Sequence, residues 1–146
     1  MIRNTQILFI AMLAGQALFA AVAYFFLPAN KSAGLADSGL FFYLPFIFMM
    51  VMGGAAWVLN DTLKRKAPGQ DKPLDERLRH YQQRVLLRLA MMESAVLMAI
   101  IFGFVSANIQ LYLLAALGLG LFIYFRPSTA EFVSDYQVSA SEEREL

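Results

Sequence analysis

Long stretches without a charged side chain constrain this sequence more than any other feature. Residues 4–30, 38–60 and 94–125 contain no Asp, Glu, Lys or Arg, and charged residues make up 16% of the chain. A soluble domain usually keeps about a quarter of its residues charged. Uncharged apolar runs of about 18 residues or more are typical of membrane-spanning helices. The sequence therefore predicts an integral membrane protein of the all-α class.

Four apolar segments predict a membrane-embedded four-helix bundle that forms a single domain over residues 1–146. The expected spans are 7–27, 40–59, 86–106 and 109–125. A loop rich in Pro, Gly and Ser separates the first two spans at 28–39, and the second span is expected to end at Asn60-Asp61, before a basic turn. The fourth segment is short for a bilayer whose hydrocarbon core is about 30 Å thick, so local thinning of the membrane is expected there.

Polar extensions flank the third and fourth spans. In the amphipathic stretch 71–85, apolar residues recur at spacings of four, three and four, at Leu74, Leu78, Tyr81 and Val85. No break separates this stretch from the third span, so one helix of about 33 residues, roughly 50 Å long, is expected. In the polar tail 126–146, Ser128 and Glu131 have the spacing of a capping box, which predicts a short helix.

The basic residues are distributed very unevenly among the loops. Eleven of the twelve fall on one side of the expected spans, and Lys31 is alone on the other. Because basic loops stay in the cytoplasm, both termini are predicted to be cytoplasmic, in a cell inner (plasma) membrane. The residues expected to set this orientation and to extend toward anionic lipid headgroups are Lys64, Arg65, Lys66, Arg84 and Arg88. Nucleic acid is not an expected partner, because Asp71, Asp75 and Glu76 interrupt the basic cluster.

The two halves of the chain share a weak similarity that favours two parallel, repeat-like hairpins. A shift of 79 residues aligns six positions of the first span with six identical residues of the third. These positions are Leu8, Ala11, Met12, Leu18, Ala20 and Phe25, which meet Leu87, Ala90, Met91, Leu97, Ala99 and Phe104. Duplicated hairpins are a known route to membrane folds, and chance matching between apolar segments is the alternative.

Glu93 is the acidic residue inside a predicted span, and Gln16 lies at a similar expected depth in the first span. An unpaired carboxylate in the bilayer is costly, so Glu93 is expected to be neutral, paired or facing a polar interior. Two interpretations remain open: a structural hydrogen bond to a neighbouring helix or subunit, and an ion or proton site formed with Gln16. Few other polar residues occur within the spans, which favours the structural interpretation.

Small residues recur about one helical turn apart in three of the spans. Such positions let helices approach closely in lipid, where dispersion replaces the hydrophobic force. The expected helix-packing residues are Ala11, Gly15, Gly53, Gly54, Ala116 and Gly120. They predict packing within the bundle, in a homo-oligomer or against other membrane subunits.

The residue types favour a protein without catalytic or cofactor chemistry. The chain has no cysteine and a single histidine, and no nucleophile–base pair or phosphate-binding loop can be assembled from it. We therefore expect no enzyme activity, no metal and no cofactor. The first hypothesis is a non-catalytic subunit of a membrane complex or a homo-oligomer. The alternative is a small transporter, channel or ion-coupled subunit that uses Glu93 with Gln16.

The alternative has one topological resemblance. Two parallel hairpins with a single intramembrane carboxylate resemble the duplicated proteolipid subunits of rotary ATPases. That family has glycine repeats in its first helices and carries its carboxylate on the second helix of a hairpin. Here Glu93 lies on the first helix of the second hairpin, so the resemblance is limited to topology.

Overall fold

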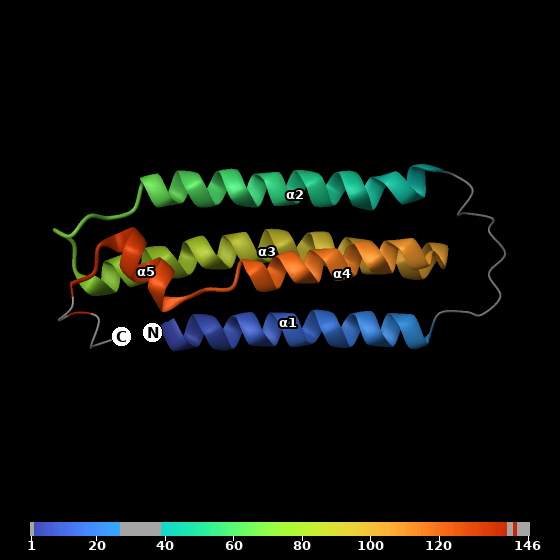
Figure 1. Cartoon of the computed structure of the whole chain (residues 1–146), viewed down its shortest axis with the longest axis horizontal. Coiled ribbons are helices and arrows are strands. Elements are labelled where there is room, and N and C mark those ends of the chain that lie inside the picture. Colours follow the sequence, from blue (N-terminus) through green and yellow to red (C-terminus); the bar gives the residue numbers. More distant parts are fainter. Residues whose placement is uncertain (1, 27–38, 140–141, 143–146) are drawn as a thin grey trace.

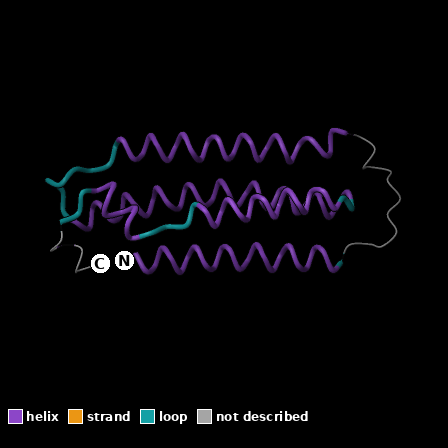
Figure 2. The backbone as a smooth tube through the Cα atoms, in the orientation of Figure 1, coloured by secondary structure: helices purple, strands orange, loops and turns teal. Residues whose placement is uncertain are grey.

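The computed structural model is all-helical over the part of the chain that it describes, residues 2–26, 39–139 and 142. Its helices are α1 (Ile2–Phe25), α2 (Gly39–Arg65), α3 (Leu74–Ser106), α4 (Ile109–Tyr124) and α5 (Thr129–Tyr136). Figure 2 shows that short loops join α2 to α3, α3 to α4 and α4 to α5. The expected loop at 28–38, with Lys31, and parts of the tail lie outside the described residues.

Three helices are long and apolar enough to cross a membrane: α1 over Arg3–Phe25, α2 over Tyr43–Arg65, and α3. α4 has 16 residues and is about 24 Å long, which is less than the hydrocarbon core of a bilayer. α4 and α5 together pass the same test, but they are bent by 57° relative to each other. The described chain thus contains three candidate spans, or up to four if the bent pair is counted as one.

α3 occupies the centre of the molecule and contacts every other helix. In Figure 1, α1 and α2 lie on either side of α3, whereas α4 and α5 overlap it in the view. The helix has 33 residues, in agreement with the single long helix expected from the sequence. Leu78, Tyr81 and Val85 of the amphipathic stretch are at most 4% exposed, which confirms that this stripe packs inward.

α2 extends further than the sequence predicted. The expected end at Asn60-Asp61 is wrong, because the helix continues to Arg65. Lys64 and Arg65 occupy its last turn, where positive charge interacts favourably with the helix dipole. Arg65 also donates a hydrogen bond to Asp61, one turn earlier, at 2.9 Å. These local interactions allow a polar sequence to remain helical beyond the apolar run.

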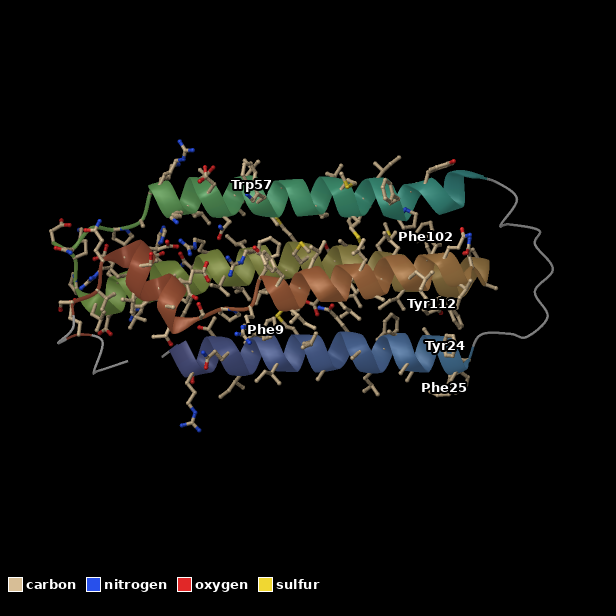
Figure 3. The ribbon with its side chains drawn as sticks, viewed as in Figure 1. Phe9, Tyr24, Phe25, Trp57, Phe102 and Tyr112 are labelled. Atoms are coloured by element: carbon tan, nitrogen blue, oxygen red, sulfur yellow. The ribbon has the colours of Figure 1, made fainter. Side chains whose placement is uncertain are left out.

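Two clusters of buried apolar side chains hold the helices together. One lies near α5 and includes residues of all five helices, and in it the rings of Phe9 and Phe122 stack at 5.1 Å. The other lies toward the α3–α4 turn and includes Met49, Val96 and Ala115. Figure 3 shows Tyr24 and Tyr112 close together near the far ends of α1 and α4, and their rings are in edge contact at 6.0 Å.

Candidate functional site at the polar end

The ionic side chains with the most contacts gather at one end of the molecule, which we call the polar end. It comprises the end of α2, the N-terminal half of α3, and the whole of α5 (Figure 1). α5 begins where predicted: Ser128 is its N-cap, and its hydroxyl oxygen accepts a hydrogen bond from the Glu131 N–H at 3.1 Å. Gln137, in the left-handed conformation, ends the helix. The short helix expected from the capping-box spacing is therefore confirmed.

Two buried arginines of α3 bind the carboxylates of α5. The Arg84 side chain is fully buried and contacts Glu131 at 2.8 Å and Asp135 at 2.7 Å. Arg88 contacts Glu131 at 2.8 Å and donates a further hydrogen bond to the Phe125 carbonyl at 3.0 Å. The two arginines are one helical turn apart, as are the two carboxylates, so the charges interleave across the α3–α5 contact. We call this set the arginine latch (Arg84, Arg88, Glu131 and Asp135).

Two residues of α2 join the latch. The Lys64 ammonium lies 2.8 Å from Asp135, and the Asn60 side-chain oxygen accepts a hydrogen bond from Arg88 at 3.2 Å. Asp135 is therefore held by cations from both α2 and α3. These contacts join α5 to both α2 and α3.

Tyr81 replaces part of the usual capping box of α5. In a capping box the glutamate side chain accepts from the N-cap N–H. Here the Glu131 carboxylate is directed to the arginines, and the Ser128 N–H donates instead to the Tyr81 hydroxyl at 3.2 Å. The same hydroxyl is 3.1 Å from the Ser128 carbonyl, to which it can donate. Tyr81 of α3 thus accepts the hydrogen bond from the Ser128 N–H that Glu131 would accept in a capping box.

The last turn of α5 is held by three more contacts. Arg77 is 2% exposed, donates to the Tyr136 carbonyl at 3.3 Å and pairs with Glu142. The Tyr136 hydroxyl hydrogen-bonds His80 Nδ1 at 2.6 Å. The Arg84 guanidinium also lies 5.5 Å from the centre of the Tyr81 ring and 5.8 Å from that of Tyr136. These cation–π contacts cover guanidinium N–H groups that have no hydrogen-bond partner in the described structure.

The environment of α5 shifts its ionisable groups. Burial acts to raise the pKa of Asp135, but hydrogen bonds from Lys64 and Arg84 outweigh it and hold that pKa below its usual value. Burial raises the pKa of Tyr136 to about 12. Burial, with a smaller contribution from the Arg84 charge, lowers the pKa of His80. At neutral pH His80 is therefore neutral. Asp135 is ionised, as its ion pairs with Lys64 and Arg84 require.

The arginine latch is suited to structural attachment of α5. Its cations and carboxylates are directed at one another, and the described residues hold no group of three or more His, Cys, Asp or Glu that could bind a metal ion. A buried network of charge-assisted hydrogen bonds favours one helix arrangement. Its ion pairs attach α5 to the neighbouring helices.

The structure corrects the expected role of Arg84 and Arg88. Rather than extending toward lipid headgroups, both side chains turn inward and are at most 5% exposed, because α5 offers carboxylates at matching spacing. Lys64 and Arg65 pair with Asp135 and Asp61. Lys66 is exposed. Most of the charge expected to face lipid is thus neutralised within the protein.

Gln16 and Glu93 are not joined in the structure. Gln16 is 1% exposed, and neither atom of its side-chain amide has a hydrogen-bond partner among the described residues. Glu93 is half-buried and lies at the edge of the packed face of α3, between the exposed Ala90 and the buried Val96. The expected hydrogen bond between them is therefore absent from the described structure.

Replacing Gln16 by Met should stabilise the isolated protein. A buried amide without a partner costs about 1–3 kcal/mol, and Met fills a similar volume without polar atoms. We expect a higher thermal unfolding temperature in detergent for Gln16→Met and no change for the exposed control Gln6→Met. A lower unfolding temperature for Gln16→Met would show that the amide has a partner in the native membrane.

The predicted helix-packing residues mostly face outward. Ala11, Gly15, Gly54, Ala116 and Gly120 are exposed, and Gly53 is half-buried. A Cβ atom added at Gly15, Gly53, Gly54 or Gly120 would meet no atom within 4 Å. Among the described residues these glycines therefore do not mediate close helix contacts.

Two other glycines take that role. A Cβ at Gly118 would lie 2.7 Å from Val96 Cγ2 and 2.9 Å from Met49 Cε. A Cβ at Gly103 would lie 3.0 Å from the Tyr112 ring. Gly118 thus permits the contact of α4 with α2 and α3, and Gly103 permits the tight turn between α3 and α4.

The arginine latch was missed by sequence reasoning, although a signal for it exists. Arg77, Arg84 and Arg88 are separated by seven and four residues and so share one helix face, while Glu131 and Asp135 are four residues apart. Complementary charges at the same spacing on two neighbouring helices indicate pairing.

Comparisons with known proteins add no identification: no family model, no curated protein and no solved structure matches the chain.

Proposed function

We propose that this chain is a non-catalytic structural subunit of a membrane assembly, either a homo-oligomer or a larger complex. In this proposal α1 to α4 cross the inner membrane of the cell. The polar end and both termini lie in the cytoplasm. The basic bias of the loops supports this orientation. The latch then holds α5 against the cytoplasmic end of the bundle.

The observation that carries the proposal is the outward position of the small-residue faces. Gly15 on α1, Gly54 on α2 and Gly120 on α4 have open space where a Cβ would stand. Close packing within the chain uses Gly118 and Gly103 instead. Small outward-facing residues in apolar helices allow a second helix to approach closely. These faces are therefore available to another subunit.

Glu93 supports the same conclusion independently. It lies half-buried at the edge of the packed face of α3, where contact of its exposed part with lipid would be costly for the carboxyl group. A neighbouring subunit with a hydrogen-bond donor at this depth would remove that cost. A partly exposed carboxyl group at this position is thus better explained by a partner than by a pathway through the chain.

Extraction from the native membrane in a mild detergent, followed by native mass spectrometry, tests the proposal. We expect a defined assembly, and Gly15→Leu should weaken it about tenfold, equivalent to about 1.4 kcal/mol. Thermal unfolding of the Gly15→Leu protomer should occur at the same or a slightly higher temperature, because a Cβ atom at this position meets no atom within 4 Å and leucine has the better helix propensity. The matched control Leu18→Phe, at a position 67% exposed, should assemble normally.

A protein found only as a monomer would contradict the proposal, as would equal weakening by both substitutions. The alternative, ion-coupled transport through Glu93 and Gln16, gives a different result in the same preparation. Ion flux in liposomes that is lost in Glu93→Gln would overturn the structural proposal. The separation of Gln16 from Glu93 argues against that alternative.

A further inference from the structure

We propose that the crevice between the start of α1 and α3 binds the headgroup of an anionic phospholipid. The crevice has a volume of about 440 Å³, and the described residues that line it belong to these two helices. Asn4, Thr5 and Leu8 come from α1, and Arg79, Gln82, Gln83 and Leu86 come from α3. This inference rests on the proposed membrane insertion, because it places the crevice where two spans enter the lipid.

The lining suits a phosphate group. Among the described residues it combines a guanidinium, three side-chain amides and a hydroxyl, which are groups that donate hydrogen bonds, without a carboxylate. Arg79 is exposed and makes no ion pair within the described residues, although Asp75 lies one turn before it. A basic pocket between spans on the cytoplasmic side is a typical site for an anionic headgroup. Arg84 and Arg88 are paired with carboxylates, whereas Arg79 can pair with an anionic ligand.

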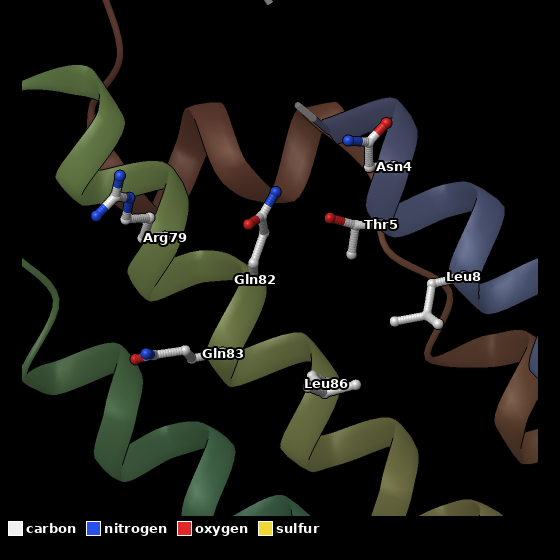
Figure 4. Close-up of a pocket in the computed structure, with 7 residues that line it drawn as sticks. All are labelled: Asn4, Thr5, Leu8, Arg79, Gln82, Gln83 and Leu86. Atoms are coloured by element: carbon white, nitrogen blue, oxygen red, sulfur yellow. The ribbon is translucent and has the colours of Figure 1, made fainter.

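A buried hydroxyl directed into the crevice is the second observation. Thr5 is 5% exposed, and its hydroxyl has no hydrogen-bond partner among the described residues. Figure 4 shows the Thr5 hydroxyl pointing from α1 across the crevice toward Gln82 of α3. A buried polar atom without a partner is costly unless a ligand or water satisfies it. A phosphate oxygen in the crevice would accept this hydrogen bond.

The apolar part of the lining indicates a lipid as the source of the phosphate. Leu8 and Leu86 are 41% and 46% exposed and mark the start of the apolar runs of α1 and α3. In Figure 4 they lie on the same side of the crevice, farther along the helices than Arg79 and Thr5. A headgroup among the polar residues would thus continue into acyl chains beside the leucines.

A second pocket, on the other side of α1, provides a matched control. It is lined by Gln6, Phe9, Ile10, Arg126, Pro127, Ser128 and Thr129 and also carries one arginine. None of its side chains is among the buried groups that lack a hydrogen-bond partner in the described structure. Arg126→Gln removes the same charge as Arg79→Gln at a comparable level along α1.

Lipid titration of the delipidated full-length protein in detergent, followed by native mass spectrometry, tests the inference. Phosphatidylglycerol should bind at one site at least about tenfold more tightly than phosphatidylcholine, since only the former is anionic. Arg79→Gln and Thr5→Val should each weaken phosphatidylglycerol binding about five- to tenfold. Thr5→Ser should restore it, because serine keeps the hydroxyl, and Arg126→Gln should leave it unchanged.

Several outcomes would overturn the inference. These are equal binding of the two lipids, an equal effect of Arg126→Gln, or Thr5→Ser behaving like Thr5→Val while unfolding at the wild-type temperature. Competition by inorganic phosphate at similar concentration would instead identify a soluble anion as the ligand. Release of the protein from membranes by alkaline carbonate would contradict membrane insertion itself. Retention without lipid preference would contradict this inference alone.

Discussion

Arg84→Met should release α5 from the rest of the protein. The substitution keeps an unbranched apolar stem but removes the fully buried guanidinium cation from Glu131 and Asp135. Breaking a buried ion pair on one side costs about 3–5 kcal/mol, and here Arg88 and Lys64 keep partial contact with the two carboxylates. We therefore expect a loss of about 2–4 kcal/mol in the stability of the docked α5. Hydrogen exchange of residues 129–136 would report it directly.

Arg65→Met is the matched control for Arg84→Met. It removes the same charge and also breaks an ion pair with an aspartate, but the Arg65 side chain is 79% exposed. Exposed pairs contribute about 0–1 kcal/mol, so little change is expected. If Arg84→Met protects residues 129–136 as well as the wild type does, the latch does not hold α5.

Acidification should weaken the arginine latch, as Arg84→Met does. The folded-state pKa of Asp135 is below its usual value, so its ionised form stabilises the docked helix above the pKa of the unfolded chain. This stabilisation is lost as the pH falls through the lowered folded-state pKa. The protection of residues 129–136 against exchange, relative to the intrinsic amide rate at each pH, should therefore decrease on acidification in the wild type. In Arg84→Met this decrease should be smaller, because one of the two cations that lower the pKa of Asp135 is absent.

Gly118→Val should be the most damaging substitution in the apolar part of the bundle. The new Cβ would lie 2.7 Å from Val96 Cγ2, and Val96 is fully buried and branched, so it has little freedom to move. Overpacking of this kind costs about 1–3 kcal/mol, with larger values where the neighbour is rigid. We expect a marked decrease in the thermal unfolding temperature of the protomer in detergent.

Gly120→Val, two residues further along α4, provides the control. No atom lies within 4 Å of its added Cβ, and valine has a slightly better helix propensity than glycine. Protomer stability should therefore stay the same or rise by a few tenths of a kcal/mol. If assembly uses the outward faces, Gly120→Val should weaken the oligomer while the protomer remains stable. Equal destabilisation by both substitutions would contradict the observed orientation of α4.

Much of the secondary structure followed from periodicity and local chemistry. Uncharged runs located the apolar helices, the spacing of Leu78, Tyr81 and Val85 indicated a continuous α3, and Ser128 with Glu131 indicated α5. The end of α2 was misplaced because Asn60-Asp61 reads as a helix stop, whereas interactions within the last turn extend the helix to Arg65. Local sequence patterns predict where helices form, because helix formation depends largely on residues that are close in the chain.

The sequence by itself determined an all-helical chain with apolar runs long enough for a membrane, and the tertiary structure decided which faces meet. In the segment Leu117-Gly118-Leu119-Gly120 the two glycines are alike in sequence, yet only Gly118 contacts other helices. Arg84 and Arg88 could reach lipid or a partner until α5 supplied carboxylates at the same spacing. The physical reason is that helix rotation is set by side-chain packing between segments far apart in the chain, which no local pattern encodes.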